Sequence, residues 1–435
     1  MKIRTVLALL AFTPLVHAAP PEAAKFKSVT LDDKLQIGYG LAIADVDGDK
    51  LPDLLLADKK QFAWYRNPGP EKAGDAAAWQ KFLLAENLTQ KDNVCIAAQD
   101  IDGDGKCEVA VGAEWNPGDT EKSGAVFYLI PPADRTRPWE PVRLHAEPTT
   151  HRMRWIRVQH SLPLLRGAEV SPAKVPWGLV VVPLHGRGNR NGEGAGVRVL
   201  LYHPPAQLND PRAEWKTELI DESLHMTHNI STLTGAGAPS DADGLVIGGK
   251  EGIRRYTRRI DGWIPLPENA KPGEGVGQQG GVGEVREPHI QSMDRDEGFI
   301  ATVEPMHGNR LMVYPGQNVV DGPRFKKGVL LTDKLAEGHA LACGDLLGAG
   351  SDQIVVGWRG KPGESALSTG VALWTPRDKQ YESWQETMID PTGMACEDLQ
   401  LADLNGDGRI DIVASGRGTK NLKIYFNETP DAAVK

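Results

Sequence analysis

One acidic turn recurs along the chain and constrains its fold more than any other feature. It is clearest at residues 403–411, where oxygen-bearing side chains alternate with other residues between two apolar segments. Related turns lie at Asp45–Asp53 and Asp100–Glu108, and a copy at Asp345–Asp352 lacks the middle carboxylates. A repeat of roughly 50–60 residues with three or four short strands per copy is typical of the blades of a β-propeller.

The number of blades follows from the outer strands, each of which reads as an aromatic residue followed by an alternating apolar stretch. Seven such stretches occur: Phe26–Leu31, Trp79–Ala85, Trp139–His145, Trp215–Asp221, Trp263–Leu266, Phe325–Thr332 and Trp384–Asp390. The first of them precedes any inner strand, so we expect it to complete the last blade and remove two free sheet edges. The sequence therefore predicts an all-β, seven-bladed β-propeller closed by an N-terminal outer strand.

The N-terminus indicates export. Residues 1–19 resemble a secretory signal peptide, because two basic residues precede the apolar run Val6–Val16 and a pair of alanines follows it. The mature propeller would be residues 20–435, periplasmic or secreted. No later segment approaches ~18 consecutive apolar residues, so we expect no membrane association. The net charge of −9, with both signs interspersed, argues against nucleic acid as a partner.

Four cysteines are too few for a disulfide scaffold. Three of them, Cys95, Cys343 and Cys396, lie at or beside inner-strand positions, which favours buried free thiols. A disulfide between Cys95 and Cys107 is the alternative in an oxidising compartment.

The acidic turns suit hard cations. Carboxylate and amide oxygens at alternate positions around a tight loop are the ligands that Ca²⁺ prefers, and Mg²⁺ is the alternative ion. The candidate ligands are Asp45, Asp47, Asp49, Asp53, Asp100, Asp102, Asp104, Glu108, Asp403, Asn405, Asp407 and Asp411.

A second candidate site lies at the opposite mouth of the channel, where the inner strands begin. About six residues before each turn position the chain carries Tyr39, Asn93, Arg154, His228, His289, His339 and Glu397. Three consecutive blades thus offer a histidine to one region near the axis. Converging imidazoles suit a divalent transition metal, most typically Zn²⁺, with an open position for substrate. We predict His228, His289 and His339 as its ligands.

Motifs of other chemistries are missing from the sequence. It contains no GxSxG, HExxH, P-loop or CxxC motif, so nucleophilic hydrolysis and thiol chemistry have no support. The glycine-rich stretch Lys271–Gly283 contains a lone GxGxxG, but no strand precedes it and no helix follows, so we expect a surface loop. A metal beside histidines, tyrosine and arginines suits proton abstraction next to a carbonyl group.

The residues carry a family resemblance. The acidic turns resemble FG-GAP/VCBS repeats, as in integrin-α-like propellers. Several segments are similar to the propeller domain of aldos-2-ulose dehydratase (1,5-anhydro-D-fructose dehydratase): Leu224–Asn229, Gly283–Ile290, Ala301–Asn309, Glu337–Leu341, Gly357–Gly360 and Gly393–Asp398. This resemblance implies a metal-assisted dehydration, by β-elimination, of a keto-sugar at the propeller mouth.

Transferred to this sequence, the resemblance implies His307 or Tyr39 as the base. It implies that Glu397, Arg154 and Arg359 bind or polarise a small carbohydrate substrate. Two other functions stay open: a non-catalytic propeller that binds carbohydrate or protein, and a lyase that eliminates across polysaccharide linkages. The sequence leaves the oligomeric state open.

Overall fold

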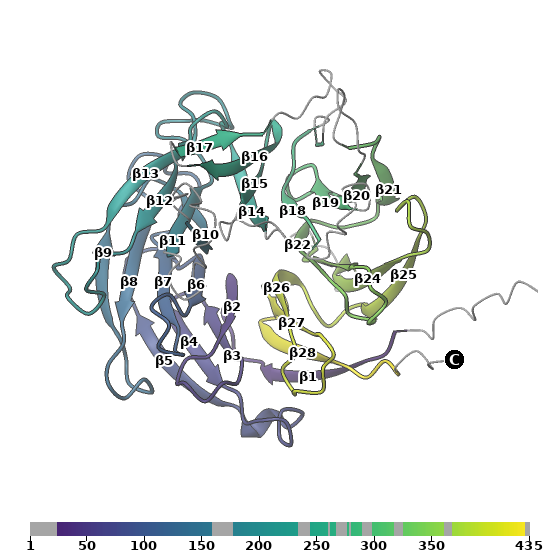
Figure 1. Ribbon diagram of the computed structural model, residues 1–435, viewed down its shortest axis with the longest axis horizontal. Helices are drawn as coiled ribbons and strands as arrows, with labels where there is room; N and C mark the ends of the chain where they lie inside the picture. Colours follow the sequence, from purple (N-terminus) through teal and green to yellow (C-terminus); the bar gives the residue numbers. More distant parts are fainter. Residues whose placement is uncertain are drawn as a thin grey trace, which may run out of the picture.

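The chain forms seven four-stranded antiparallel sheets arranged around a central channel (Figure 1). The structure is a computed structural model, and it describes residues 24–158, 177–233, 244–259, 262–266, 276–277, 280–288, 298–316, 325–360 and 368–430. The expected all-β, seven-bladed architecture is confirmed. The predicted signal peptide and most of the glycine-rich stretch 271–283 lie outside these residues.

Six blades each use four consecutive strands, with the inner strand first and the outer strand last. A 3-10 turn, η1 (Ala76–Ala78), precedes the outer strand of the first of these blades. The strands are β2 (Gly40–Ala44), β3 (Asp53–Ala57), β4 (Gln61–Arg66) and β5 (Gln80–Glu86); β6 (Cys95–Gln99), β7 (Glu108–Ala113), β8 (Ala125–Ile130) and β9 (Glu140–Leu144); β10 (Thr150–Arg157), β11 (Trp177–Pro183), β12 (Val199–His203) and β13 (Lys216–Asp221); β14 (Thr227–Leu233), β15 (Gly244–Gly249), β16 (Gly252–Arg259) and β17 (Gly262–Pro265); β18 (Glu284–Arg286), β19 (Phe299–Glu304), β20 (Arg310–Pro315) and β21 (Val329–Thr332); and β22 (Gly338–Gly344), β23 (Gln353–Trp358), β24 (Gly370–Pro376) and β25 (Trp384–Asp390).

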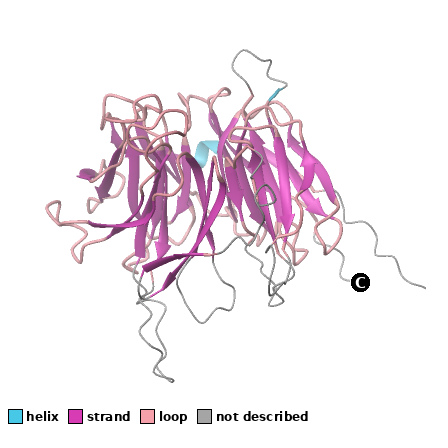
Figure 2. Ribbon diagram, turned by 90° about the horizontal axis from the view of Figure 1, so that it is seen from above, coloured by secondary structure: helices cyan, strands magenta, loops and turns pink. Residues whose placement is uncertain are grey.

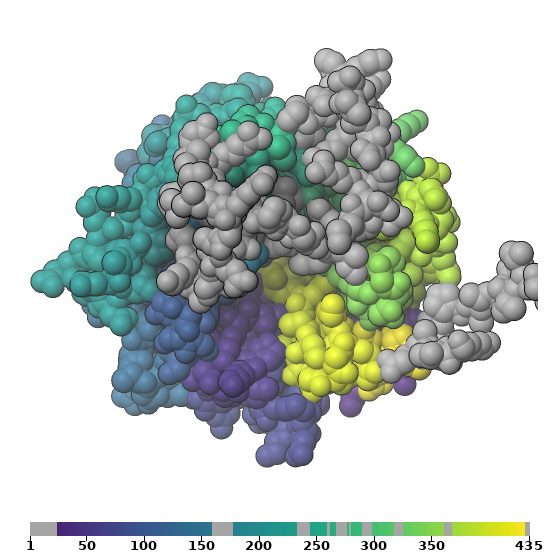
Figure 3. Space-filling view, in the orientation of Figure 1, coloured from purple at the N-terminus to yellow at the C-terminus, as the bar shows by residue number. Residues whose placement is uncertain are grey.

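The seventh blade combines both ends of the described chain. It contains β26 (Cys396–Ala402), β27 (Asp411–Gly416), β28 (Asn421–Asn427) and, as its outermost strand, β1 (Phe26–Asp32). β1 runs antiparallel to β28, with Phe26 opposite Asn427. In the space-filling view the first blade borders the last one (Figure 3). There the Leu41 N–H donates to the Asp398 carboxylate at 2.9 Å, which joins the two inner strands.

The core lies between neighbouring blades. The second strand of each sheet is covered on both faces, and all five residues of β3 are buried. Outer strands contain both half-buried and exposed residues, as in β25, because one side of these strands faces solvent. All four cysteines are buried free thiols. The expectation of free thiols is therefore confirmed, and the alternative Cys95–Cys107 disulfide is not formed.

Strand direction assigns the loops to two faces. Inner strands begin, and second strands end, on one face of the disc. The acidic turns that join these strands lie on the opposite face. Figure 2 shows the strands crossing the disc from one face to the other. Of the helices in the described part, none has the length and apolar content required to cross a bilayer.

Candidate functional site at the channel mouth

Four inner strands share a β-bulge near their first residue. In β10, for example, Thr150 pairs with Pro183 and Arg152 pairs with Val182, which leaves the intervening residue unpaired. A bulge re-aims the side chains around the extra residue. The strand register shifts in the same way around His151, His228, His339 and Glu397.

Three histidines meet at the mouth. One ring nitrogen from each of His228, His307 and His339 lies within 4.8 Å of the others. The Nε2 atoms of His228 and His307 are 2.7 Å apart, and the rings of His307 and His339 stack with centroids 4.8 Å apart. His228 and His339 come from bulged inner strands, whereas His307 comes from the loop between β19 and β20.

Backbone carbonyls of neighbouring blades fix the tautomer of these rings. Nδ1 of His228 donates to the Gly283 carbonyl at 3.0 Å, and Nδ1 of His339 donates to the Glu397 carbonyl at 2.7 Å. Because a carbonyl only accepts, both protons must lie on Nδ1, which leaves Nε2 as the basic nitrogen. This arrangement, with Nδ1 donating and Nε2 left without a proton, is the one that orients metal-ligating histidines.

Burial keeps the cluster neutral. Burial, followed by the charges of nearby arginines including Arg359, lowers the pKa of His228 and of His339 well below the usual range. Burial and the neighbouring His228 likewise lower the pKa of His307. Neutral imidazoles are the protonation state that a metal requires, so the donor set fits a divalent transition metal.

A carboxylate and two arginines border the histidines. Glu397 accepts from Arg359 at 2.9 Å and from Arg417 at 3.3 Å, and its carboxylate lies 3.9 Å from Nε2 of His339. Glu337 accepts from Nε of Arg359 at 2.9 Å. Burial lowers the pKa of Arg359, but Glu397 and Glu337 together raise it by more, so the pKa of Arg359 lies above its usual value.

Tyr39 extends this network across the mouth. The Arg417 guanidinium lies 5.6 Å from the centre of its ring, and its hydroxyl donates to Asp92 at 3.3 Å. Burial raises the pKa of Tyr39, and Asp92 and Glu397 add to the effect while Arg417 opposes it. The phenol therefore keeps its proton at neutral pH.

The sequence prediction missed His151. Its ring lies 4.7 Å from that of His228 and stacks on Trp115 at 4.9 Å, and its Nδ1 donates to the His228 carbonyl at 3.0 Å. Burial lowers its pKa well below the usual range. Alignment on the acidic turns failed here because this blade has no such turn. The Thr-His pair that opens both β10 and β14 is the signal that could have found it.

The other predicted site residues fall into two groups. The structure brings His228, His339, His307, Glu397, Arg359 and Tyr39 together at the mouth. Arg154 lies three residues deeper along β10 than His151 and lines the channel with Asp398. The inner strand of the fifth blade ends at Arg286, earlier than expected, and His289 lies outside the described residues. The third imidazole beside His228 and His339 is that of His307.

On the opposite face, two acidic turns gather carboxylates. Oxygens of Asp45, Asp47 and Asp53 lie within 4.8 Å of one another, as do those of Asp100, Asp102 and Glu108.

Backbone N–H groups donate hydrogen bonds to the first and last acids of these turns. Asp45 accepts from Gly48 and Lys50 at 2.7 Å, and Asp53 accepts from Val46 at 2.9 Å and from Asn67 at 2.8 Å.

The turn of the sixth blade makes similar hydrogen bonds without the middle carboxylates. Asp345 accepts from Ala349 and Gly350 at 2.8 Å, and the side chain of Gln353 accepts from Leu347 at 2.9 Å. The turn thus forms without the middle carboxylates and with an amide in place of the last acid. The middle acids of the other turns are therefore not needed for the turn to form, although they also accept backbone hydrogen bonds, as Asp49 does from Leu51 and Asp104 does from Lys106.

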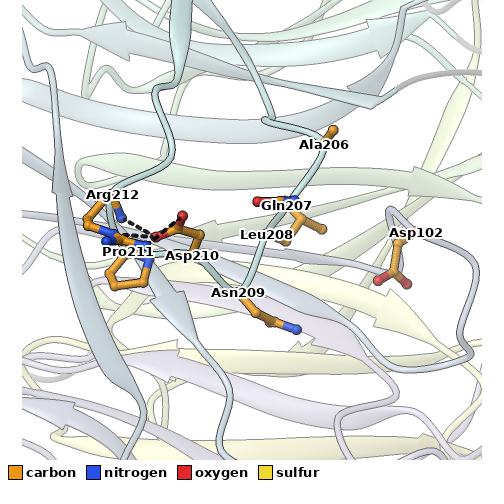
Figure 4. A pocket seen from close by; sticks show the side chains of 8 residues that line it. All are labelled: Asp102, Ala206, Gln207, Leu208, Asn209, Asp210, Pro211 and Arg212. Carbon is orange, nitrogen blue, oxygen red and sulfur yellow. Dashed lines mark hydrogen bonds and ion pairs between the residues drawn. The ribbon is translucent and has the colours of Figure 1, made fainter.

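The acidic-turn face also carries a hollow of about 660 Å³ (Figure 4). It is lined by Asp102 and by residues 206–212 from the loop between β12 and β13. Arg212 is paired with Asp210 at 3.1 Å and remains largely exposed. The hollow contains no cluster of catalytic groups and lies on the face away from the histidines.

Comparisons with known proteins agree with the resemblance drawn from the sequence. Residues 45–111 match the model of the FG-GAP-like repeat, and residues 123–317 match the model of the aldos-2-ulose dehydratase β-propeller domain. The aldos-2-ulose dehydratase of Phanerodontia chrysosporium is 23% identical over 258 residues. That match covers 54% of this chain and 27% of the relative, so the chain matches only about a quarter of the relative's length.

One solved structure is similar in fold. The BBS1N chain crystallised in complex with ARL6DN superposes with a TM-score of 0.52 at 11% identity, covering 95% of this chain and 100% of that one. A rhamnogalacturonan lyase, YesW, reaches a TM-score of 0.45 at 14% identity, covering 93% of this chain and 76% of its own. The chain is thus a seven-bladed β-propeller whose residues 45–111 match the FG-GAP-like repeat and whose segment 123–317 is similar to the propeller domain of aldos-2-ulose dehydratases.

Proposed function

We propose that the protein is a metal-dependent carbon–oxygen lyase that dehydrates a keto-sugar at the channel mouth. The observation that carries the proposal is the cluster of His228, His307 and His339, three neutral imidazoles in one mouth. The similarity of residues 123–317 to a sugar dehydratase propeller supports the substrate class.

The three histidines would hold the ion, most simply Zn²⁺, through one nitrogen each. When bound, the ion supplies a Lewis acid for the carbonyl oxygen of the substrate. Arg359 and Arg417, held by Glu397, supply fixed positive charge beside that position. Because Glu397 pairs with both arginines, we assign it to positioning them.

Two further residues take the proton-transfer roles. Tyr39 keeps its proton at neutral pH, so it suits donation to the leaving hydroxyl better than proton abstraction. His307 belongs to the ligand cluster, so we assign the proton acceptor to Nε2 of His151, the basic nitrogen left once Nδ1 has donated to His228. Trp115 holds the plane of that ring by stacking.

The first experiment measures bound metal and activity together. Purified protein should contain about one equivalent of a transition metal at the mouth. It should also raise ultraviolet absorbance when mixed with aldos-2-uloses, and a chelator should abolish that change. Metal-free protein that turns over a keto-sugar at the same rate would refute the metal site. Absorbance rising with uronate polymers alone would favour the polysaccharide lyase, and sugar binding without turnover would favour a binding propeller.

Two variants distinguish the metal ligand from the residue that accepts the proton. His307→Gln should lose the metal and the activity together. His151→Gln should keep the metal and lose turnover, with little change in KM. If His151→Gln retains turnover while His307→Gln loses it with metal still bound, the two roles are reversed.

We further propose that the propeller is exported and carries Ca²⁺ or Mg²⁺ in its acidic turns. The N-terminal 19 residues support export, and the carboxylate clusters of the first two turns support the cations. Detection of the mature chain starting near residue 20 in the periplasm or medium would test the first of these. Retention of the N-terminus on cytosolic protein would refute it.

A further inference from the structure

A small cavity lies in the channel one layer below the histidines. It is bordered by residues that directly follow the mouth residues in sequence: Arg152 follows His151, Asn229 follows His228, and Asp398 follows Glu397. Arg154 adds a second guanidinium to the same wall. Five inner strands contribute to the lining, so the cavity is formed only when the ring is assembled.

Among the described residues, neither Arg152 nor Arg154 has a carboxylate hydrogen-bonded to it. Arg152 is 7% exposed, its Nε has no hydrogen-bond partner, and one Nη donates at 3.4 Å to the Tyr39 carbonyl. Among the described residues, no hydrogen bond or ion pair reaches Arg154. A buried cation without a hydrogen-bonded counter-charge is costly.

Of the two nearby carboxylates, Glu284 pairs with Arg286 at 3.8 Å, and Asp398 does not offset the charge of Arg152 or Arg154 directly. Asp398 accepts from the backbone N–H groups of Leu41 and Leu399, both at 2.9 Å, rather than from either arginine. The electrostatic neighbours of Arg154 are two further arginines, Arg152 and Arg286, and two acids, Glu284 and Asp398. Three guanidinium groups therefore face two carboxylates.

We propose that this cavity binds one small monovalent anion of halide size. The volume of about 20 Å³ admits a single guest close to the size of a water molecule and excludes phosphate, sulfate or a sugar acid. The anion would accept from the guanidinium groups of Arg152 and Arg154, which both line the cavity. It would also supply the missing negative charge. The site does not depend on the proposed catalytic role.

Crystals of the full chain grown or soaked in bromide test the site directly. An anomalous peak between Arg152 and Arg154 is the expected result. A peak confined to the protein surface, or an ordered water bridging the arginines to Asp398 in bromide, would overturn the proposal.

Thermal unfolding supplies a second measurement. At equal ionic strength, wild-type protein should be more stable in sodium chloride than in sodium gluconate, whose anion is too large. Chloride at ten times its Kd should shift the folding equilibrium about 11-fold. Arg154→Met should remove this chloride-specific difference, whereas Arg143→Met, which deletes a positive charge from the exposed outer strand β9, should keep it. An equal chloride response in Arg154→Met and wild type would refute the site, and if Arg154→Met does not fold, the bromide peak decides.

Discussion

The buried acids of the cation turns should make stability fall as pH rises unless a divalent ion is present. Burial is the largest effect on Asp53 and raises its pKa to about 7; two backbone hydrogen bonds oppose the rise, and Asp47 and Asp49 add to it. Burial likewise raises the pKa of Glu108 to about 7 and that of Asp411 to about 6. The folded chain therefore holds protons that the unfolded chain has lost above about pH 4.

The sign follows from proton binding. Between about pH 4 and pH 7 the folded state binds more protons than the unfolded state, so the free energy of unfolding decreases as pH rises. For Asp53, moving the pKa from 3.8 to about 7 corresponds to about 4 kcal/mol. A cation that neutralises the charge of the turn would raise the free energy of unfolding by a similar amount. For a chain of 435 residues, about 4 kcal/mol corresponds to about 4 °C in Tm.

The assay is thermal unfolding at pH 5 and pH 8, in chelator and in millimolar Ca²⁺. In chelator Tm should drop by several degrees between the two pH values, and Ca²⁺ should restore it at pH 8 but change little at pH 5. Asp102→Asn should weaken the Ca²⁺ effect, whereas Asp119→Asn, an equal change of charge outside the turns, should not. A Tm in chelator that is constant or higher at pH 8 would refute the reasoning.

Three further predictions concern the mouth. His339→Ala should abolish metal binding and turnover while circular dichroism and Tm stay near those of wild type; turnover without metal loss would contradict the ligand assignment. Arg359→Met leaves the buried Glu397 with Arg417 alone, so it should lower the free energy of unfolding by about 2–4 kcal/mol. Arg359→Lys, which keeps the charge, should lower it less, and equal losses in chemical denaturation would argue against the ion pair. Tyr39→Phe should lower kcat with metal content unchanged, and an unaltered kcat would exclude Tyr39 as the proton donor.

The fold was predictable because its signals are local and repeated. Each outer strand has its own aromatic and alternating pattern, and each acidic turn marks the end of an inner strand, so an error in one blade is corrected by the next. Even the turn at Asp345, without its middle acids, keeps the spacing. The fifth blade is the exception: β18 has three residues, Glu284–Arg286, too few to carry a period-two pattern.

The site was harder to predict because it depends on register rather than composition. Counting back from the acidic turns aligned Arg154 with the histidines, because the blade that begins with β10 has no such turn to count from. His307 was expected as a separate base because its loop position gave no indication that its ring nitrogen lies 2.7 Å from that of His228. The neighbour relations across the ring, such as Trp115 stacking on His151, are set by packing between blades that lie far apart in sequence.

The bulges explain how one ring of strands can build two different layers. In a regular strand consecutive side chains point to opposite faces, so a histidine at the mouth would be followed by a residue turned away from it. A bulge breaks that alternation, and both members of the pairs His151–Arg152, His228–Asn229 and Glu397–Asp398 border the axis. The first member of each pair supplies an imidazole or a carboxylate to the mouth, and the second member supplies a polar or charged side chain to the cavity below. Deleting His151, the unpaired residue, should therefore leave Arg152 opposite Val182, on the face that it shares with Arg154. The deletion should disturb the mouth and spare the cavity below.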